Sequence, residues 1–222
     1  MEGTIRQVLK EMHHLLVRHF GRQHWWPGET PLEVMVGAIL TQNTNWRNVE
    51  KAIDNVKQLD LLSFKALEDV PTHKLAEAIR PAGYYNVKAK RLKNLIHFIM
   101  SAYGGEWDRL ACEKTAALRE GLLSVKGIGP ETADSILLYA MERPLFVIDA
   151  YTHRILNRHG LIEQEATYED LQALFMDHLT DDPRLFNDFH ALIVVTGKQF
   201  CKKRPICSIC PLLEWGPTSP GR

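Results

Sequence analysis

Three of the four cysteines of this 222-residue chain lie close together near its end, with the spacing Cys201-x5-Cys207-x2-Cys210, whereas Cys112 stands alone. The apolar pattern of the N-terminus contains charged residues, unlike the apolar core of a signal peptide, so we expect the chain to act in the reducing cytoplasm. Clustered cysteines in that compartment hold a metal ion or an iron–sulfur cluster more often than they form disulfides. The spacing therefore predicts metal-ligand chemistry in a C-terminal loop.

A second group of residues is suited to binding an anion through the backbone. The turn Val125-Lys126-Gly127-Ile128-Gly129 joins two stretches of helical periodicity. Gly127 and Gly129 allow backbone angles that other residues resist and let a phosphate approach closely. The unpaired N–H groups at the start of the following helix can then bind that phosphate, and Ile128 is expected to anchor the turn in the core. The pattern favours a helix–hairpin–helix that grips the DNA backbone without reading sequence, although a simple glycine-capped corner between two helices has the same pattern.

Helices must position these residues, because apolar side chains recur at spacings of three and four along nearly the whole chain. Several helix starts are marked, by Pro31, by Asp149, and by Thr167 with Asp170 three residues later. The short apolar run 145–149 lies between two helices and fits a buried loop as well as a strand. The predicted fold class is all-α, with about ten helices, of which the longest are expected over residues 5–20, 86–103 and 184–200.

Composition excludes several classes of protein. Hydrophobic residues make up 45% of the chain and charged residues 24%, which is ordinary for a globular protein and too apolar for a disordered one. No run reaches the ~18 apolar residues of a membrane helix, so we expect no membrane partner. The 27 basic residues balance 27 acidic ones, which argues against coating nucleic acid by bulk charge. Two local tracks remain candidates for phosphate contacts: Lys88, Lys90, Arg91 and Lys93, and Lys202, Lys203 and Arg204.

Several motifs occur in a fixed order: Leu40-Thr41-Gln42-Asn43-Thr44, Gly83-Tyr84-Tyr85-Asn86-Val87-Lys88-Ala89-Lys90, the glycine turn, Val147-Ile148-Asp149 and the C-terminal cysteines. In this combination the sequence resembles the endonuclease III superfamily of DNA glycosylases, over roughly residues 25 to 210. The resemblance implies two helical domains flanking a DNA-binding cleft. We expect one domain at residues 22–135, with the Gln loop and the hairpin, and a second from residues 1–21 plus 136–222, with Asp149 and the Cys loop.

The resemblance also implies roles for single residues. Asp149 matches the catalytic aspartate, whose carboxylate near the sugar C1′ would stabilise the positive charge that develops as the base leaves and would activate water. Without that context, an aspartate at a helix start is an ordinary N-cap. Gln42 would fill the gap that the target base leaves in the duplex, and its plain alternative is a loop or capping amide.

Glu131 occupies the position at which members that also cut the DNA backbone have a lysine nucleophile. A carboxylate cannot form a Schiff base, so we expect a monofunctional glycosylase that leaves an abasic site. The alternative is that Lys126 or another lysine takes over the role of the amine.

Trp25-Trp26-Pro27, together with Trp46, resembles the base pocket of the 3-methyladenine glycosylase branch. An alkylated purine carries a positive charge, and a cationic ring over an aromatic face gains roughly 0.5–2 kcal/mol. Core packing is the commoner fate of such tryptophans, and for Trp46 the two interpretations are equally good.

The family's cysteine pattern is Cys-x6-Cys-x2-Cys-x5-Cys and holds a [4Fe–4S] cluster. Here the first gap is one residue shorter, and Gly216 stands at the fourth position. Cys201, Cys207 and Cys210 are the metal ligands that remain. A cluster whose fourth ligand is distant in the sequence or does not come from the protein is favoured, while zinc completed by a histidine, or a loop that holds no metal, stays open.

Together these features predict a monomeric, nucleoid-associated enzyme of base excision repair that acts on double-stranded DNA containing damaged, alkylated bases. Two rivals remain. One is a bifunctional glycosylase, or one specific for mismatched or oxidised bases, and the other is a noncatalytic helix–hairpin–helix module that only binds DNA.

Overall fold

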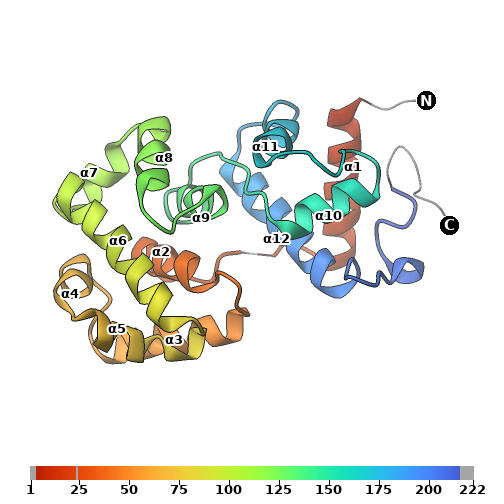
Figure 1. The fold of residues 1–222 in the computed structure, drawn as a ribbon. Coiled ribbons are helices and arrows are strands. Elements are labelled where there is room, and N and C mark those ends of the chain that lie inside the picture. The colour runs from red at the N-terminus through yellow and green to blue at the C-terminus, as the bar shows by residue number, and fades with distance from the viewer. Residues whose placement is uncertain (1–3, 24, 216–222) are drawn as a thin grey trace. The chain divides into compact units, whose positions relative to one another are not determined.

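The computed structural model describes residues 4–23 and 25–215, and over these residues it contains twelve α-helices and no strand (Figure 1). The all-α prediction is therefore confirmed. The run 145–149 is an irregular loop whose apolar residues Phe146, Val147 and Ile148 are buried. No helix within the described ranges is long and apolar enough to cross a lipid bilayer.

The chain divides into two compact units, which we call the terminal unit, Met1–Trp26 with Pro144–Arg222, and the middle unit, Pro27–Arg143. The edges expected from the sequence, at residues 22 and 135, differ from these. The upper edge moves because the π-helix Ile136–Ala140, which is almost wholly apolar, packs on a helix of the middle unit.

The terminal unit is organised around α12 (Pro183–Gln199), which contacts α1 (Ile5–Phe20) and α10 (Ala150–Arg158). Ten of its seventeen residues are buried, among them the polar residues Asp188, His190 and Thr196. Gly197 lets α10 approach closely, because a Cβ there would lie 2.3 Å from a ring carbon of Tyr151. The fourth helix of the unit is α11 (Tyr168–Met176), whose Phe175 stacks on Phe146 at 3.8 Å between ring centroids.

The middle unit is built on α2 (Pro31–Leu40), in which residues 33–40 are all buried. It packs against α3 (Trp46–Gln58), α6 (Tyr85–Tyr103) and the π-helix. Its remaining helices are α4 (Phe64–Asp69), α5 (Thr72–Ala78), α7 (Trp107–Cys112), α8 (Thr115–Ser124) and α9 (Pro130–Ser135).

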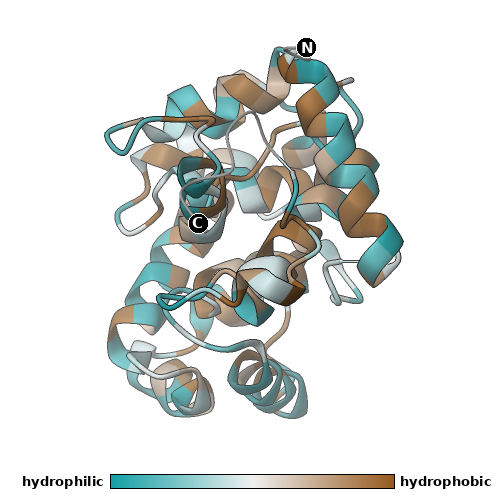
Figure 2. Ribbon diagram, turned by 90° about the vertical axis from the view of Figure 1, so that its right-hand side faces the viewer, coloured by the Kyte–Doolittle hydropathy of each residue, from teal (hydrophilic) through white to brown (hydrophobic). Residues whose placement is uncertain are grey.

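Local signals explain many of the helix ends. Thr30 caps α2 by accepting from the N–H of Glu33, and Pro31 follows as its first residue, where a missing N–H costs nothing. Thr167 and Asp170 form the expected capping box of α11. Hydrophilic and hydrophobic residues alternate along most helices, as amphipathic helices around a core require (Figure 2).

Candidate functional site

Asp149 is the N-cap of α10. Its Oδ1 accepts hydrogen bonds from the backbone N–H of Thr152 at 2.7 Å and from the Thr152 hydroxyl at 2.9 Å. Its Oδ2 lies 3.7 Å from Nε2 of His190 on α12, and only 10% of the Asp149 side chain is exposed. One carboxylate oxygen thus caps the helix, while the other faces a histidine.

The environment of Asp149 keeps its carboxylate charged. Burial alone would raise the pKa of this group, but His190 and the two hydrogen bonds from Thr152 outweigh burial and hold the pKa below its usual value. A fixed, partly desolvated anion of this kind can stabilise a developing positive charge or accept a proton from water.

The loop before α10 is held from several sides. Phe146 stacks on Phe175, and the N–H of Ile148 donates to the hydroxyl of Tyr168 at 3.3 Å. His190 was not identified from the sequence, because it is a single histidine in an apolar helix. Only the packing of α12 on α10 brings it to Asp149.

The glycine turn lies between α8 and α9 of the middle unit and has the expected anchor, since Ile128 is 6% exposed. Gly127 has a φ of +99°, and a Cβ there would lie 2.4 Å from Cγ of Arg91. Gly129 is the N-cap of α9, and a Cβ there would meet nothing within 4 Å. Lys126 is exposed. The two glycines therefore differ: Gly127 is required by the turn, whereas Gly129 borders open space.

The Gln loop and the hairpin are joined through Gln42. Its amide nitrogen donates to Oγ1 of Thr132 at 2.9 Å and to the carbonyl of Gly127 at 3.3 Å. Its amide oxygen accepts a short hydrogen bond from Arg91. Arg91 and Gln42 are 49 residues apart in the sequence, so no local sequence pattern predicts their contact.

The predicted basic track along α6 is wrong at Lys88. This side chain is 1% exposed, and its Nζ donates to the carbonyls of Leu40 and Ala82, each at 2.8 Å. Burial and the nearby charge of Arg91 lower the pKa of Lys88 to about 8. Lys88 therefore ties the Gln loop to the segment before α6 and does not face a phosphate.

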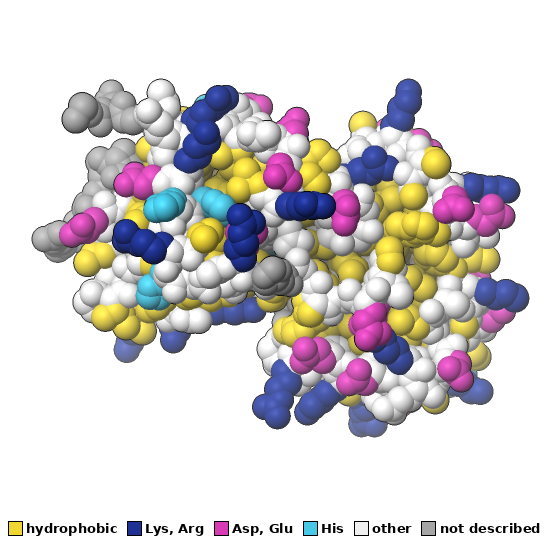
Figure 3. Space-filling model, turned by 180° about the vertical axis from the view of Figure 1, so that it is seen from behind, with side chains coloured by type: hydrophobic (Ala, Val, Ile, Leu, Met, Phe, Trp, Pro, Cys, Tyr) yellow, Lys and Arg dark blue, Asp and Glu magenta, His cyan; other side chains and the backbone are white. Residues whose placement is uncertain are grey.

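The other cations of the two tracks differ in exposure. Lys90 is exposed, Arg91 is half-buried, and Lys93 donates to three carbonyls at the end of α4. Lys202, Lys203 and Arg204 are all exposed. On the face shown in Figure 3, Lys and Arg side chains are interspersed with Asp and Glu and are not gathered into one basic sheet. This distribution agrees with the zero net charge of the sequence.

The tryptophans proposed for a base pocket belong to both units. Trp25 and Trp26 are half-buried in the terminal unit, edge to face with 5.9 Å between ring centroids, and Nζ of Lys198 lies 5.8 Å from the Trp25 ring. Pro27 and Trp46 belong to the middle unit, where Nε1 of Trp46 donates to Glu50. Their common role as a pocket stays a prediction. Glu131, which the resemblance is expected to place at the lysine position of bifunctional members, is exposed in the first turn of α9.

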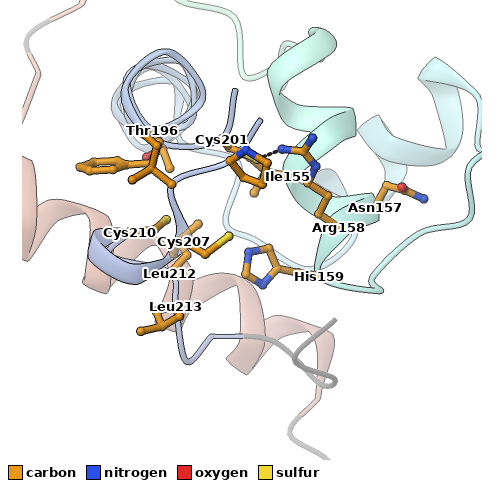
Figure 4. A pocket seen from close by; sticks show the side chains of 13 residues that line it. Ile155, Asn157, Arg158, His159, Thr196, Cys201, Cys207, Cys210, Leu212 and Leu213 are labelled. Atoms are coloured by element: carbon orange, nitrogen blue, oxygen red, sulfur yellow. Dashed lines mark hydrogen bonds between the residues drawn. The ribbon is translucent and has the colours of Figure 1, made fainter. Parts of the chain in front are cut away.

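Cys201, Cys207 and Cys210 line one cavity of about 410 Å³ in the terminal unit, together with Arg158 and His159 (Figure 4). Within the described part of the chain, no three His, Cys, Asp or Glu side chains are gathered closely enough to hold a single metal ion. Burial raises the pKa of the Cys210 thiol and lowers the pKa of His159, the latter against the effect of a backbone carbonyl at Trp215. Gly216, where the family has its fourth cysteine, lies outside the described residues.

The C-terminal half of α10 holds this loop in place. Arg158 donates to the sulfur of Cys201 at 3.2 Å and to the carbonyls of Lys202 and Lys203. Arg154 donates to the carbonyl of Cys201 at 2.7 Å. The backbone of Lys202 and Lys203 is therefore held by the helix that Asp149 caps.

Comparison with known proteins gives concordant results. Residues 36–180 match the family model described as HhH-GPD superfamily base excision DNA repair protein. The chain is 48% identical over 210 residues to "Putative DNA repair glycosylase MJ1434" of Methanocaldococcus jannaschii, covering 94% of this chain and 96% of that protein.

Solved structures agree with this assignment. The crystal structure of the 3-methyladenine DNA glycosylase MagIII from H. pylori, bound to 1,N6-ethenoadenine, is 33% identical with a TM-score of 0.75 and covers 89% of this chain and 98% of its own. A trapped endonuclease III–DNA covalent intermediate has a TM-score of 0.80 at 21% identity and covers 97% of this chain and 96% of its own, which shows a shared fold.

Proposed function

Because this chain belongs to the HhH-GPD superfamily of base excision DNA repair proteins and is a DNA glycosylase, we propose that it hydrolyses the N-glycosidic bond of alkylated bases of the 3-methyladenine type. In this proposal the enzyme is monofunctional and leaves an abasic site in an uncut strand. Relatives of the fold have been solved in complex with DNA, which is the expected partner.

The observation that carries the hydrolytic mechanism is the charged carboxylate of Asp149. As the bond to the base breaks, the sugar gains oxocarbenium character, and an adjacent anion lowers the energy of that state. Thr152 fixes one oxygen, so the carboxylate is oriented before substrate binds. His190, 3.7 Å from the other oxygen, is a positioning residue for it. Water then attacks C1′, and it gives a proton to the carboxylate as the new bond between C1′ and the water oxygen forms.

The absence of lyase chemistry rests on Glu131. At the position that matches the lysine nucleophile of bifunctional members, this chain has a carboxylate in the first turn of α9. A carboxylate supplies no amine to form a Schiff base with C1′, so the covalent route and the strand cut that follows it have no nucleophile at that position.

The preference for alkylated bases is supported by two observations. The H. pylori structure at 33% identity is named a 3-methyladenine DNA glycosylase and has 1,N6-ethenoadenine bound. In this chain, Trp25 and Trp26 lie edge to face and are only half-buried. A base alkylated at N3 or N7 is already cationic, so it stacks favourably on an aromatic face and leaves without prior protonation.

In the proposed complex the hairpin holds the DNA backbone and Gln42 enters the duplex. A Cβ at Gly129 would meet nothing within 4 Å, so a phosphate can approach the turn there. The first helical N–H available to it is that of Glu131, because Pro130 has none. Gln42 would exchange its present hydrogen bonds to Gly127 and Thr132 for contacts with the gap left by the target base.

We include a [4Fe–4S] cluster in the C-terminal loop. The donor set fits such a group, since three thiols line one cavity and an arginine N–H donates to the sulfur of Cys201. When bound, the cluster would be structural and would hold the loop that carries Lys202, Lys203 and Arg204.

Release of bases from methylated duplex DNA tests this function. We expect chromatography to show free 3-methyladenine or 7-methylguanine, with strand breaks only after alkali. Duplexes with oxidised or mismatched bases serve as comparison substrates. Strand cutting without alkali, or an enzyme–DNA adduct trapped by borohydride, would contradict the monofunctional mechanism. Release of oxidised or mismatched bases alone would contradict the substrate class.

A further inference from the structure

The Cys-rich loop supplies three thiols, whereas iron–sulfur clusters and structural metal ions in proteins are normally held by four ligands. The cavity formed by the loop, shown in Figure 4, is lined by Cys201, Cys207 and Cys210. The remaining cysteine, Cys112, belongs to the middle unit and does not line it. If the chain itself supplies the fourth donor from the described lining of this cavity, that donor is of another residue type.

Among the described residues, His159 is the one histidine in the lining of this cavity. It is the C-cap of α10, directly after Arg158, and comes from a different element than the cysteines. In Figure 4 its ring lies on the side of the cavity opposite the backbone of the Cys loop, with Cys207 between them.

The tautomer of His159 is fixed by a backbone carbonyl. Nδ1 lies 2.7 Å from the carbonyl oxygen of Trp215, and because a carbonyl only accepts, Nδ1 must carry the proton. The lone pair of the neutral ring is then on Nε2. Metal-bound histidines typically donate their second ring N–H to a carbonyl or carboxylate in this way.

The acceptor is itself well anchored. Trp215 is 2% exposed, its indole N–H donates to the carbonyl of Val8 at 2.8 Å, and its ring lies 4.9 Å from that of His159. Arg158 adds an N–H donor to the sulfur of Cys201. Two consecutive residues of one helix end are thus directed at the thiol-lined cavity.

We propose that Nε2 of His159 is the fourth ligand of the metal centre, with the sulfurs of Cys201, Cys207 and Cys210. This inference rests on the cluster included in the proposed function. Ligation forms three metal–sulfur bonds and one metal–nitrogen bond, and it releases one proton from each thiol and none from the neutral imidazole. Replacing a thiolate by imidazole makes the centre one charge unit less negative, beside a loop that carries three cations.

A cluster suits these donors better than a single ion. Zinc requires its four donors within about 2.0–2.3 Å of one point, and the described His and Cys side chains are not gathered in that way. The larger body of a cluster takes its ligands at separate corners, around a space such as this cavity of about 410 Å³.

The experiment compares the full chain with His159→Ala, His159→Cys and Cys207→Ser. His153→Ala is the matched control, because His153 lies on the same helix, bonds the carbonyl of Gln164 and does not line the cavity. Each protein is reconstituted anaerobically with ferrous iron and sulfide, and separately with Zn²⁺ alone. Iron, sulfide and zinc are counted per chain. Pulsed EPR of the reduced centre, with ¹⁵N-labelled histidine, detects a nitrogen bound to iron.

We expect the wild type and His153→Ala to hold iron and sulfide and to show a strong histidine nitrogen coupling. His159→Ala and Cys207→Ser should lose most of the iron. His159→Cys should keep iron and lose the coupling, which separates loss of a ligand from loss of the Trp215 hydrogen bond. Stoichiometric zinc instead of iron, with three sulfurs and one nitrogen by X-ray absorption, would support His159 and overturn the cluster.

Three outcomes would overturn the inference: wild-type protein that holds neither metal, a cluster without nitrogen coupling, or full iron retention in His159→Ala. Release of methylated bases is measured on the same samples. If those bases are not released while the nitrogen coupling is present, the proposed function fails and the ligand assignment stands.

Discussion

Nε2 of His190 lies 3.7 Å from Oδ2 of Asp149, and the two side chains are 8% and 10% exposed. The two oxygens of this carboxylate have different neighbours: Oδ1 accepts hydrogen bonds from Thr152, and Oδ2 faces His190. An N-cap and a catalytic carboxylate are therefore compatible in the same residue. Asp149 serves α10 with Oδ1 and keeps Oδ2 for the side that His190 faces.

Asp149→Asn should separate these two duties. Asparagine caps helices as well as aspartate does, so the melting temperature should stay close to that of the wild type. Loss of the anion should reduce single-turnover excision on the order of 10²- to 10³-fold. Asp182→Asn is the matched control, since Asp182 is the N-cap of α12 in the same unit. Excision that survives in Asp149→Asn would remove Asp149 from the mechanism.

His190→Gln should move the pH profile of excision. Burial raises the pKa of Asp149, and the contributions of His190 and Thr152 that lower it prevail. Without His190 the pKa should rise, so the acid limb of the rate against pH should move to higher pH. Ionised Asp149 stabilises the folded protein above the pKa of this group in the unfolded state, and that stabilisation is lost as the pH falls through the pKa in the folded state. In His190→Gln the stabilisation should be smaller. His178→Gln is the control, and an unchanged acid limb in His190→Gln would show that the histidine does not act on Asp149.

Lys88→Met should destabilise the middle unit. It removes the Lys88 donor from the buried carbonyl of Leu40, at a cost of about 1–3 kcal/mol, and leaves the carbonyl of Ala82 with the hydroxyl of Thr44 as its donor at 2.7 Å. The pH dependence gives a second readout. The pKa of Lys88 is about 8 in the folded protein and higher in the unfolded chain, so above pH 8 the unfolded chain binds more protons. The stability of the wild type should therefore rise with pH from about 8 up to the unfolded pKa. Denaturant unfolding at pH 7 and above pH 9 should show this rise in the wild type and in the exposed control Lys90→Met. A rise of equal size in Lys88→Met would contradict the assignment.

The two hairpin glycines should respond differently to alanine. Gly127→Ala meets both a positive φ and the side chain of Arg91, so the melting temperature should fall, by the equivalent of about 1–2 kcal/mol or more. Gly129→Ala meets nothing within 4 Å, so stability should stay within about 0.5 kcal/mol of the wild type. Its methyl group would nevertheless stand where the phosphate approaches, so DNA affinity should drop several-fold. Wild-type affinity in Gly129→Ala, measured by fluorescence anisotropy, would place the phosphate elsewhere.

Local chemistry made much of the fold predictable. Pro31, Asp149 and the Thr167–Asp170 box act within one helical turn, and the structure has helix starts at all three. The six-residue α7 was not predicted, because it is too short for an apolar period to show. The general position of the hairpin followed from its glycines, which depend on backbone geometry alone.

Long-range packing made the rest unpredictable. Lys88 had the sequence context of an exposed cation, but its ammonium group is fixed by carbonyls 48 and 6 residues away. His190 and His159 are ordinary in their own helices and gain meaning only from partners 41 and 56 residues distant. No local spacing contains those contacts.

The two partners of the Asp149–His190 pair are synthesised at different times, because 41 residues separate them in the sequence. Asp149 leaves the ribosome before His190. The helix that carries His190, α12, also packs on α1, and its Asp188 lies 3.2 Å from His13 of α1. A nascent chain that has passed residue 149 therefore still lacks its histidine and the helix that brackets the carboxylate. On the proposed mechanism, a chain at this stage would carry the carboxylate without the histidine that positions it, so excision would begin only after α12 has been made and has packed on α10.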